Sequence, residues 1–252
     1  MKILAISDFH GETELMNSLV EKIEDKSPDL IIFTGDVVKG QARGDEWLSA
    51  QEEGREPVKD KEEILNEKNE DFKLYDEFYD TLDTLDIPVM CIPGNMDAPE
   101  DVFFSYLLGK YMRSNIKIAQ ENIFEKEGYL ISGMGGEITN GSKEDFFTLQ
   151  YPYKEADFAL RRFKYAPQKK ILLLHSPPTG QLDLDKGKHK SEDVVNELIR
   201  DIKPEIVFCG HAHKAQGKEQ IDKTLVVNPG ALKYGDFAVV NTENKEVDFG
   251  TV

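Results

Sequence analysis

Short runs of apolar residues recur along the chain, and stretches with helical spacing separate several of them. Residues 1–7 form the first run, in which most positions are apolar, as is typical of a parallel strand covered on both faces. Residues 12–25 then carry a large apolar residue at every fourth position in their middle part, which predicts a helix. Because another apolar run follows at once, this order predicts a right-handed crossover in an open sheet.

The remaining chain adds further helices and a second group of strands. Spacing of apolar residues predicts helices over residues 72–85, 99–112 and 144–166, and a further helix that starts at Ser191. Apolar runs predict strands at residues 29–34, 89–93, 116–119, 129–132, 171–174, 206–209, 224–228, 237–241 and 246–249. We therefore expect an α/β fold in which two sheets pack as a β-sandwich flanked by helices.

Residues 40–73 interrupt this alternation. The segment is rich in charged residues, has few large apolar ones and contains the only tryptophan, Trp47. One interpretation is a solvated helical excursion without a catalytic role. The alternative is a lid, because the segment begins soon after Asp36, one of the candidate ligands described below. Trp47 then either anchors the segment by packing, which we favour, or offers a surface on which a ring of the substrate stacks.

Residues that bind metals follow five of the apolar runs. These residues are Asp8 and His10, then Asp36, then Asn95 and Asp97, then His175, and finally His211 and His213. Four of the five histidines stand in these positions, whereas scattered core or surface histidines would not collect there. Because ligands in open α/β sheets gather at the carboxyl ends of strands, we expect these side chains to meet at one edge.

The donor types indicate which ions such a site would bind. Neutral imidazoles, carboxylates and an amide oxygen suit the divalent ions of Mn, Fe, Zn, Co or Ni, and the lack of thiolate ligands argues against a structural zinc site. Even seven of these eight groups are too many for one octahedral centre, and a carboxylate can bridge two ions. The sequence therefore predicts two divalent transition-metal ions.

Charge narrows the range of partners. The formal net charge of −17 over 252 residues argues against non-specific binding to nucleic-acid backbones or to anionic membrane surfaces, because both need a basic face. A substrate that carries phosphate would depend on the metals for local positive charge. The sequence is compatible with a homo-oligomer but does not define one.

Cysteine usage and the ends of the chain bear on its location. Cys91 and Cys209 lie in apolar runs without a C-x-x-C spacing, so we expect buried, reduced thiols and a cytoplasmic location. We expect no secretion signal at the N-terminus and no membrane span, which would need about 20 apolar residues. The length suits one domain over residues 1–252 with the charged insertion inside it.

The order of these motifs resembles the calcineurin-like metallophosphoesterase superfamily, and the resemblance spans almost the whole chain. It is carried by Asp8-Phe9-His10, Gly35-Asp36, Gly94-Asn95-x-Asp97, His175 and Gly210-His211-x-His213. The turns Pro93 to Pro99 and Asn228-Pro229-Gly230-Ala231 are also similar to small prokaryotic members. The resemblance implies a four-layer α-β-β-α fold and hydrolysis of a phosphate ester, either a phosphodiester or a small phosphomonoester.

The resemblance also implies roles for individual residues. By position, Asp8, His10 and His213 resemble the ligands of one metal, Asn95, His175 and His211 those of the other, and Asp36 the bridge. A metal-bridging hydroxide would then attack phosphorus while both ions stabilise the developing charge. The candidate catalytic residues on this interpretation are Asp36, Asn95, Asp97 and His175.

One position departs from the family pattern. Most members have His after the Asn of the third motif, where it acts on the leaving group, and this chain has Met96, whose thioether cannot donate a proton. We therefore treat Met96 and His189, a candidate substitute, as candidate substrate-binding residues. The alternative function is a catalytically weak or inactive binding or scaffold protein, as the corresponding subunit of the retromer coat is thought to be. Met96 supports that alternative, and the otherwise complete ligand set opposes it.

Overall fold

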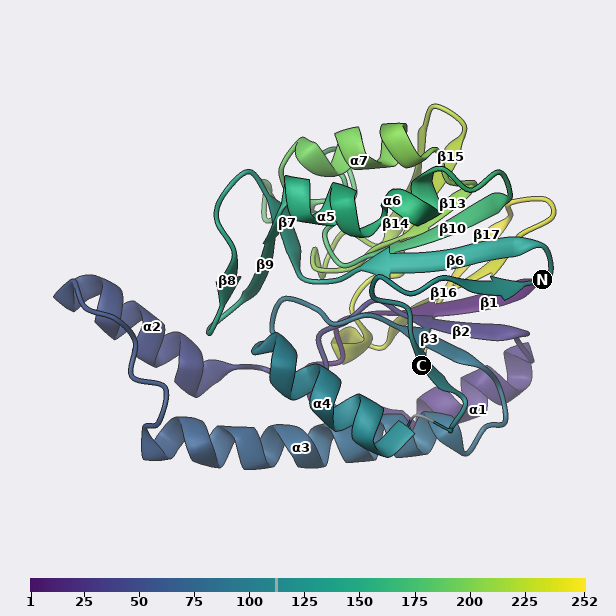
Figure 1. The fold of residues 1–252 in the computed structure, drawn as a ribbon. Coiled ribbons are helices and arrows are strands. Elements are labelled where there is room, and N and C mark those ends of the chain that lie inside the picture. Colours follow the sequence, from purple (N-terminus) through teal and green to yellow (C-terminus); the bar gives the residue numbers. More distant parts are fainter. Residues whose placement is uncertain (112) are drawn as a thin grey trace.

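Two six-stranded sheets face each other at the centre of the protein (Figure 1). The computed structural model describes residues 1–111 and 113–252. The first sheet has the order β17 (Val247–Thr251), β16 (Asp236–Asn241), β1 (Lys2–Ile6), β2 (Leu30–Phe33), β3 (Val89–Cys91) and β4 (Ile116–Ile118). The second has the order β14 (Gly217–Ile221), β15 (Thr224–Asn228), β13 (Ile206–Phe208), β10 (Lys169–Leu174), β6 (Tyr129–Met134) and β5 (Phe124–Lys126).

Each sheet combines a parallel group of four strands with antiparallel edges. Strands β1 to β4 run parallel, whereas β16 pairs antiparallel with β1 and β17 with β16. In the second sheet β6, β10, β13 and β15 run parallel, whereas β5 and β14 pair antiparallel at the two edges. The carboxyl ends of the parallel strands within each sheet therefore lie at one edge.

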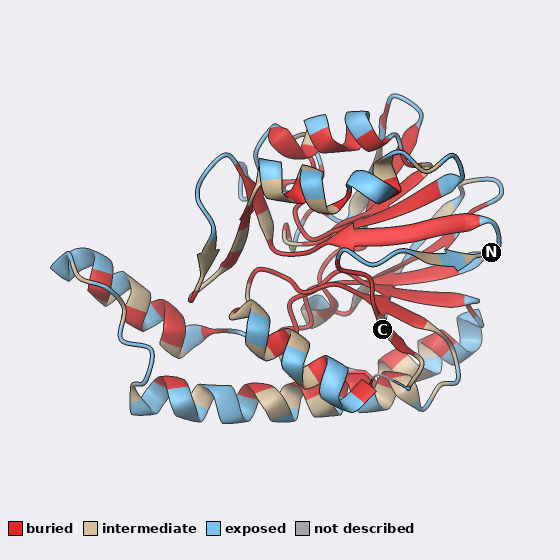
Figure 2. Cartoon of the chain, viewed as in Figure 1, coloured by how far each residue is buried: buried red, intermediate tan, exposed pale blue. Residues whose placement is uncertain are grey.

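The apolar runs are continuous because both faces of each sheet are covered. In β10, Ile171 and Leu173 belong to the core between the sheets, whereas Leu172 and Leu174 pack in the core beneath the outer helices. All four side chains are fully buried. Figure 2 shows the same burial along the other central strands. A strand that alternates between two apolar layers has no polar face, which explains the pattern in the sequence.

Helices cover both outer faces of the sandwich and give four layers (Figure 1). The helices on the first sheet are α1 (Met16–Lys26), α3 (Glu62–Asp83) and α4 (Glu100–Tyr111), and those on the second are α5 (Tyr153–Ala159), α6 (Arg161–Lys164) and α7 (Val194–Ile202). The predicted α/β sandwich flanked by helices is confirmed. None of the described helices is long and apolar enough to cross a membrane.

Smaller elements complete the described chain. They are the 3₁₀ turns η1 (Thr13–Leu15) and η2 (Leu232–Tyr234), the three-stranded sheet of β7 (Glu137–Thr139), β9 (Leu149–Pro152) and β8 (Glu144–Asp145), and the pair β11 (Leu184–Asp185) and β12 (Lys188–His189). Cys91 and Cys209 are both buried and free, as predicted.

The prediction of a helix over residues 144–166 is wrong for its first part, which forms β8 and β9. The Glu144 carboxylate accepts hydrogen bonds from the backbone N–H groups of residues 146, 147 and 148, at 3.0, 3.2 and 2.8 Å. A side chain that holds these groups in a tight turn replaces the helical hydrogen bonds. The predicted helix 99–112 corresponds to α4, and Met112 lies outside the described residues.

The charged segment, residues 40–73, forms two helical parts that we call the arm, namely α2 (Gln41–Glu53) and the first half of α3. Helix α2 projects from the body, and the first half of α3 extends beyond the sandwich beside it (Figure 1). Helix α3 therefore begins ten residues before the predicted helix at residue 72. The Trp47 ring packs 5.8 Å from that of Phe147, which agrees with a packing anchor.

Arg43 fixes the root of this arm. It is only 5% exposed, and its guanidinium donates hydrogen bonds to the carbonyl oxygens of Met96, at 2.9 Å, and Ala98. The carboxylates of Glu67 and Asp71 on α3 lie 3.7 and 3.6 Å from the same guanidinium. The arm is thus attached to the turn that follows β3.

Asp71 should make the stability of the protein depend on pH. Burial raises the pKa of Asp71 from 3.8 to about 7, although Arg43 opposes the shift. Because the folded chain keeps this proton to a higher pH than the unfolded chain does, the free energy of unfolding should fall as the pH rises from about 4 to about 7. Asp71→Asn cannot ionise and should be the more stable protein at pH 8, by roughly 2–4 kcal/mol.

Urea unfolding at pH 5 and pH 8 measures this difference, and the advantage of Asp71→Asn should shrink at the lower pH. Glu77→Gln, at an exposed position on the same helix, serves as the control, and its stability relative to wild type should be the same at both pH values. A stability difference between Asp71→Asn and wild type that is the same at both pH values would contradict the raised pKa.

Candidate metal centre

The candidate ligands leave five parallel strands at adjoining edges of the two sheets. Strand β1 leads to Asp8 and His10, β2 to Asp36, and β3 to Asn95, while β10 leads to His175 and β13 to His211 and His213. Asp8, His10, Asp36 and His211 all have positive φ values, from 48° to 66°. This left-handed conformation costs a residue other than glycine about 1–3 kcal/mol, and such strain is typical of functional sites.

Glycine is required where the motifs touch. A Cβ atom added at Gly94 would collide with Oδ1 of Asp36, and one added at Gly35 would collide with the backbone of Gly94. The turns after β2 and β3 therefore pack backbone against backbone. This contact lets the Asp36 carboxylate lie beside the turn that carries Asn95.

Four of the side chains form one compact group. Asp8, His10, Asp36 and His213 each offer a ligand atom, and the four atoms lie within 4.8 Å of one another. The Nε2 atom of His213 is 3.2 Å from Oδ1 of Asp8 and 3.1 Å from Nε2 of His10. Oδ2 of Asp36 lies 3.5 Å from the same His10 nitrogen. The group is the size of a single metal site.

The other three candidates meet on the far side of Asp36. The Asn95 side-chain oxygen is 2.8 Å from Nε2 of His175 and 3.0 Å from Nδ1 of His211. The Nε2 atom of His175 is also 3.4 Å from Oδ2 of Asp36. This oxygen of Asp36 thus lies between the two groups, and the structure brings all seven predicted ligands together.

Two histidines are held in the tautomer that a metal ligand needs. Nδ1 of His10 lies 3.0 Å from the carbonyl oxygen of Val38, and Nδ1 of His175 lies 2.8 Å from that of Thr34. Since a carbonyl can only accept, each Nδ1 carries a proton, and a neutral ring then turns the lone pair of Nε2 toward the cluster. A lone pair that faces carboxylate and amide oxygens needs a cation between them, either a proton or a metal ion, so the donor set fits metal ions.

The pKa values of the carboxyl and imidazole groups in the cluster also favour a bound cation. Burial acts to raise the pKa of Asp8 and of Asp36, but the surrounding histidines outweigh it and hold both pKa values below the usual range. Burial lowers the pKa of His175, yet the Asp36 and Asp8 carboxylates raise it to about 10. For His211, burial and the nearby His175 lower the pKa to about 4. The buried carboxylates thus favour positive charge between them.

Asp97 does not join the ligand cluster. Its carboxylate accepts hydrogen bonds from the backbone N–H groups of Gly94, Asp36 and Val37, at 2.7, 2.9 and 3.0 Å, and from the hydroxyl of Tyr75 at 3.1 Å. These bonds tie the Asp36 turn to the Asn95 turn. The geometry therefore favours a positioning residue over the catalytic residue that the motif suggested.

The two candidate substrate-binding residues lie in different places. The backbone N–H of Met96 donates to Oδ1 of Asp36 at 2.7 Å, and the Met96 side chain lines the pocket over the cluster. The His189 side chain is 54% exposed and bonds through Nδ1 to Asp183 at 2.9 Å. His189 does not line the pocket that Met96 lines, so the two are not brought together.

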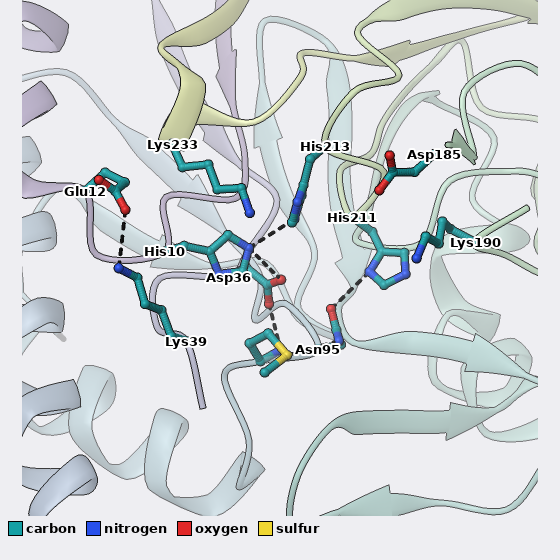
Figure 3. A pocket seen from close by; sticks show the side chains of 11 residues that line it. His10, Glu12, Asp36, Lys39, Asn95, Asp185, Lys190, His211, His213 and Lys233 are labelled. Carbon is teal, nitrogen blue, oxygen red and sulfur yellow. Dashed lines mark hydrogen bonds and ion pairs between the residues drawn. The ribbon is translucent and has the colours of Figure 1, made fainter. Parts of the chain in front are cut away.

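This pocket has a volume of about 400 Å³ and opens above the ligands (Figure 3). Its wall includes Lys39, Lys190 and Lys233, and the Lys233 ammonium group points toward His10 and His213. Lys39 forms an ion pair with Glu12 at 3.3 Å. Sequence reasoning missed Lys39 and Lys233, although each follows a recognised motif by a few residues. No described residue from 41–70 lines the pocket, and the lid stays a prediction.

Replacing Asp97 with Asn should weaken metal binding even though Asp97 lies outside the cluster. One of the two carboxylate oxygens would become an amide NH₂ group that faces N–H or O–H donors, so the turn that carries Asp36 would lose part of its acceptors. We expect the Kd for Mn²⁺, measured by isothermal titration calorimetry, to rise by roughly 10–100-fold, as for other residues that orient ligands. Tyr75→Phe removes one of the four donors to Asp97 and should have a smaller effect. Unchanged Mn²⁺ affinity in Asp97→Asn would contradict the positioning role.

Comparisons with known proteins agree with the geometry. The family model for metallophosphoesterases of the calcineurin superfamily matches residues 1–252. No curated protein matches the chain. One crystal structure is 27% identical, with a TM-score of 0.89 and coverage of 99% of this chain and 98% of its own.

Two further structures share the fold. The protein TT1561 of Thermus thermophilus is 23% identical, with a TM-score of 0.73 and coverage of 99% and 98%. A dimetal phosphatase from Danio rerio is 11% identical, with a TM-score of 0.63 and coverage of 100% and 95%. The match of the family model over the whole chain is decisive, and the protein belongs to the metallophosphoesterases of the calcineurin superfamily.

Proposed function

We propose that the protein hydrolyses phosphate esters, phosphodiesters or small phosphomonoesters, with the help of two divalent metal ions. The observation that carries this proposal is the position of Asp36, whose Oδ2 is 3.5 Å from a nitrogen of His10 and 3.4 Å from a nitrogen of His175. A carboxylate oxygen between two groups of candidate ligands is suited to bridge two ions.

The ligands divide on either side of this oxygen. Asp8, His10 and His213 would hold one ion, and Asn95, His175 and His211 the other, with Asp36 shared. Mn, Fe, Zn, Co and Ni all suit these donors. When bound, such ions lower the pKa of coordinated water toward neutrality and stabilise charge on phosphoryl oxygens.

The side chains around the cluster would draw in and hold an anionic ester. Lys190 and Lys233 make no ion pair with a described residue, so their ammonium groups are available to phosphoryl oxygens. In a chain with a net charge of −17, lysines on the pocket wall focus positive potential where the phosphate must enter. Met96 faces the same pocket and offers no proton to a departing alcohol.

A binding or scaffold protein that keeps the metals without turnover is the second candidate. Met96 favours it, because the leaving-group histidine of the family pattern is absent. The complete ligand cluster opposes it, since seven aligned donors have no use in a pure scaffold. Turnover of a diester or monoester by the purified protein would separate the two candidates.

Hydrolysis of an aryl phosphate ester should require an added divalent metal and stop with chelator. Asp8→Ala and His175→Ala should each reduce kcat/KM for 4-nitrophenyl phosphate or its diester by at least about 100-fold, because each removes a buried ligand. Asp248→Ala, at an exposed position on β17, is the control for a carboxylate outside the site. Hydrolysis that persists in both ligand variants would belong to another protein in the preparation.

Elemental analysis of the same proteins tests the number of metals. Wild type reconstituted with Mn²⁺ should hold close to two ions per chain, and Asp36→Ala should hold fewer. A metal content that never exceeds one ion, or that Asp36→Ala leaves unchanged, would overturn the two-metal proposal.

Met96→His tests whether position 96 lacks a general acid. The new imidazole should raise the rate for alkyl esters much more than for nitrophenyl esters, because only poor leaving groups need the proton. General acid catalysis is worth about 10²–10⁴-fold. Metal content must be the same in both proteins, since the turn at position 96 is tight. Equal effects on alkyl and aryl esters would show that position 96 is not the site of the missing acid.

A further inference from the structure

A second cavity adjoins the pocket over the ligand cluster. It has a volume of about 410 Å³ and shares two wall residues, His211 and Lys190, with the first pocket. Its remaining polar wall comes from Glu137 and Thr139 on β7, from Ser176 after β10, from the candidate residue His189 on β12, and from Ser191 and Glu192 just before α7. A phosphate held beside His211 would therefore direct one of its substituents into this second cavity.

Glu137 is a partly buried polar group of this cavity that lacks a partner. The residue is half-buried, and its carboxylate makes no hydrogen bond with any described residue. Burial raises its pKa, although the nearby His175 acts against the shift. A carboxyl group that is partly removed from water without a hydrogen bond is costly, unless a ligand supplies the missing partner.

Ser191 and Glu192, which precede α7, extend the same polar wall. The Ser191 hydroxyl is buried and has no hydrogen-bond partner in the described chain. The Glu192 carboxylate is held in place, because its Oε2 accepts hydrogen bonds at 2.9 Å from the backbone and from the side chain of Asn140. Lys190 also lines the cavity, so its wall carries a basic side chain beside the two acidic ones.

The mixture of groups determines which substituent would fit. A second phosphate would be attracted by Lys190 but repelled by Glu137 and Glu192, and an ammonium group would be attracted by these carboxylates but repelled by Lys190, so no single charge matches the whole wall. An alkyl chain would leave Glu137 and Ser191 unpaired. A hydroxyl group both donates and accepts, so it can satisfy the carboxylates, the serine and the lysine together.

We propose that this second cavity binds a substituent of the phosphate ester and selects a hydroxyl-rich one, a sugar or glycerol unit, over an aliphatic one. This inference rests on the proposed phosphoesterase function and names the class of its substrate. A site built to bond hydroxyl groups discriminates strongly against an analogue that lacks them, because its own polar groups then stay unpaired.

The test uses two diesters with the same leaving group, glyceryl 4-nitrophenyl phosphate and propyl 4-nitrophenyl phosphate, in the presence of Mn²⁺. Wild type should favour the glyceryl ester by at least about tenfold in kcat/KM. Glu137→Ala should move this ratio toward one. Glu125→Ala, at an exposed position on β5, should leave it unchanged. Because both esters are assayed on one preparation, any loss of folded or metal-loaded protein cancels from the ratio.

Three results would overturn the inference. The first is a wild-type ratio near one, and the second is a ratio that Glu137→Ala does not change. The third is preference for the 2-aminoethyl ester over the glyceryl ester, which would assign the cavity to an ammonium group. If neither nitrophenyl diester is hydrolysed although the protein holds its metals, this inference fails. Hydrolysis of 4-nitrophenyl phosphate by the same preparation then decides whether the proposed function fails with it.

Discussion

The burial of two carboxylates beside each other is the constraint on which the rest of the site depends. Asp8 and Asp36 are at most 1% exposed, and taking such anions out of water is very costly without compensation. The backbone supplies part of it, since the His211 N–H donates to Asp8 at 3.0 Å and the Met96 N–H to Asp36 at 2.7 Å. The carbonyl oxygens of Val38 and Thr34 fix His10 and His175 so that each ring turns Nε2 toward the carboxylates. A cation at this place, either a proton on an imidazole or a metal ion, completes the balance.

The two-sheet architecture explains how one edge can provide so many donors. Each sheet contributes the carboxyl ends of its parallel strands. The apolar layer that includes Ile171, Leu173 and Phe208 packs between the sheets and holds them face to face. No single strand brings more than two ligands, and several leave the strand in a left-handed conformation that only tight packing can hold. The core therefore fixes where the strands end, and the packed, hydrogen-bonded turns after the strands set the distance between the two donor groups.

Most of the fold, and the meeting of the seven candidate ligands at one place, could be predicted because each depends on a pattern that survives in the sequence. Strands covered on both faces are uninterrupted apolar runs, and their ligands follow immediately. The misassigned residues 144–152 lack this property, since the hydrogen bonds of Glu144 decide their conformation. Asp97 carries the right residue type for catalysis, and only its three backbone partners show that it positions a turn. Glu137 and Lys233 follow no periodic pattern, because folding alone brings them to the site.

The described contacts of the arm reach the site from the side of the turn that carries Asn95. The Arg43 guanidinium donates to the carbonyl oxygens of Met96 and Ala98, the residues that flank the end of the Asn95 turn. Glu67 and Asp71 on α3 hold that guanidinium in turn. A shift of the arm would consequently move the turn that carries Asn95 and Met96. The Met96 N–H donates to Asp36, and the Asn95 side chain contacts His175 and His211. The segment that the sequence presents as a surface excursion is therefore coupled by buried hydrogen bonds to the position of the metal ligands.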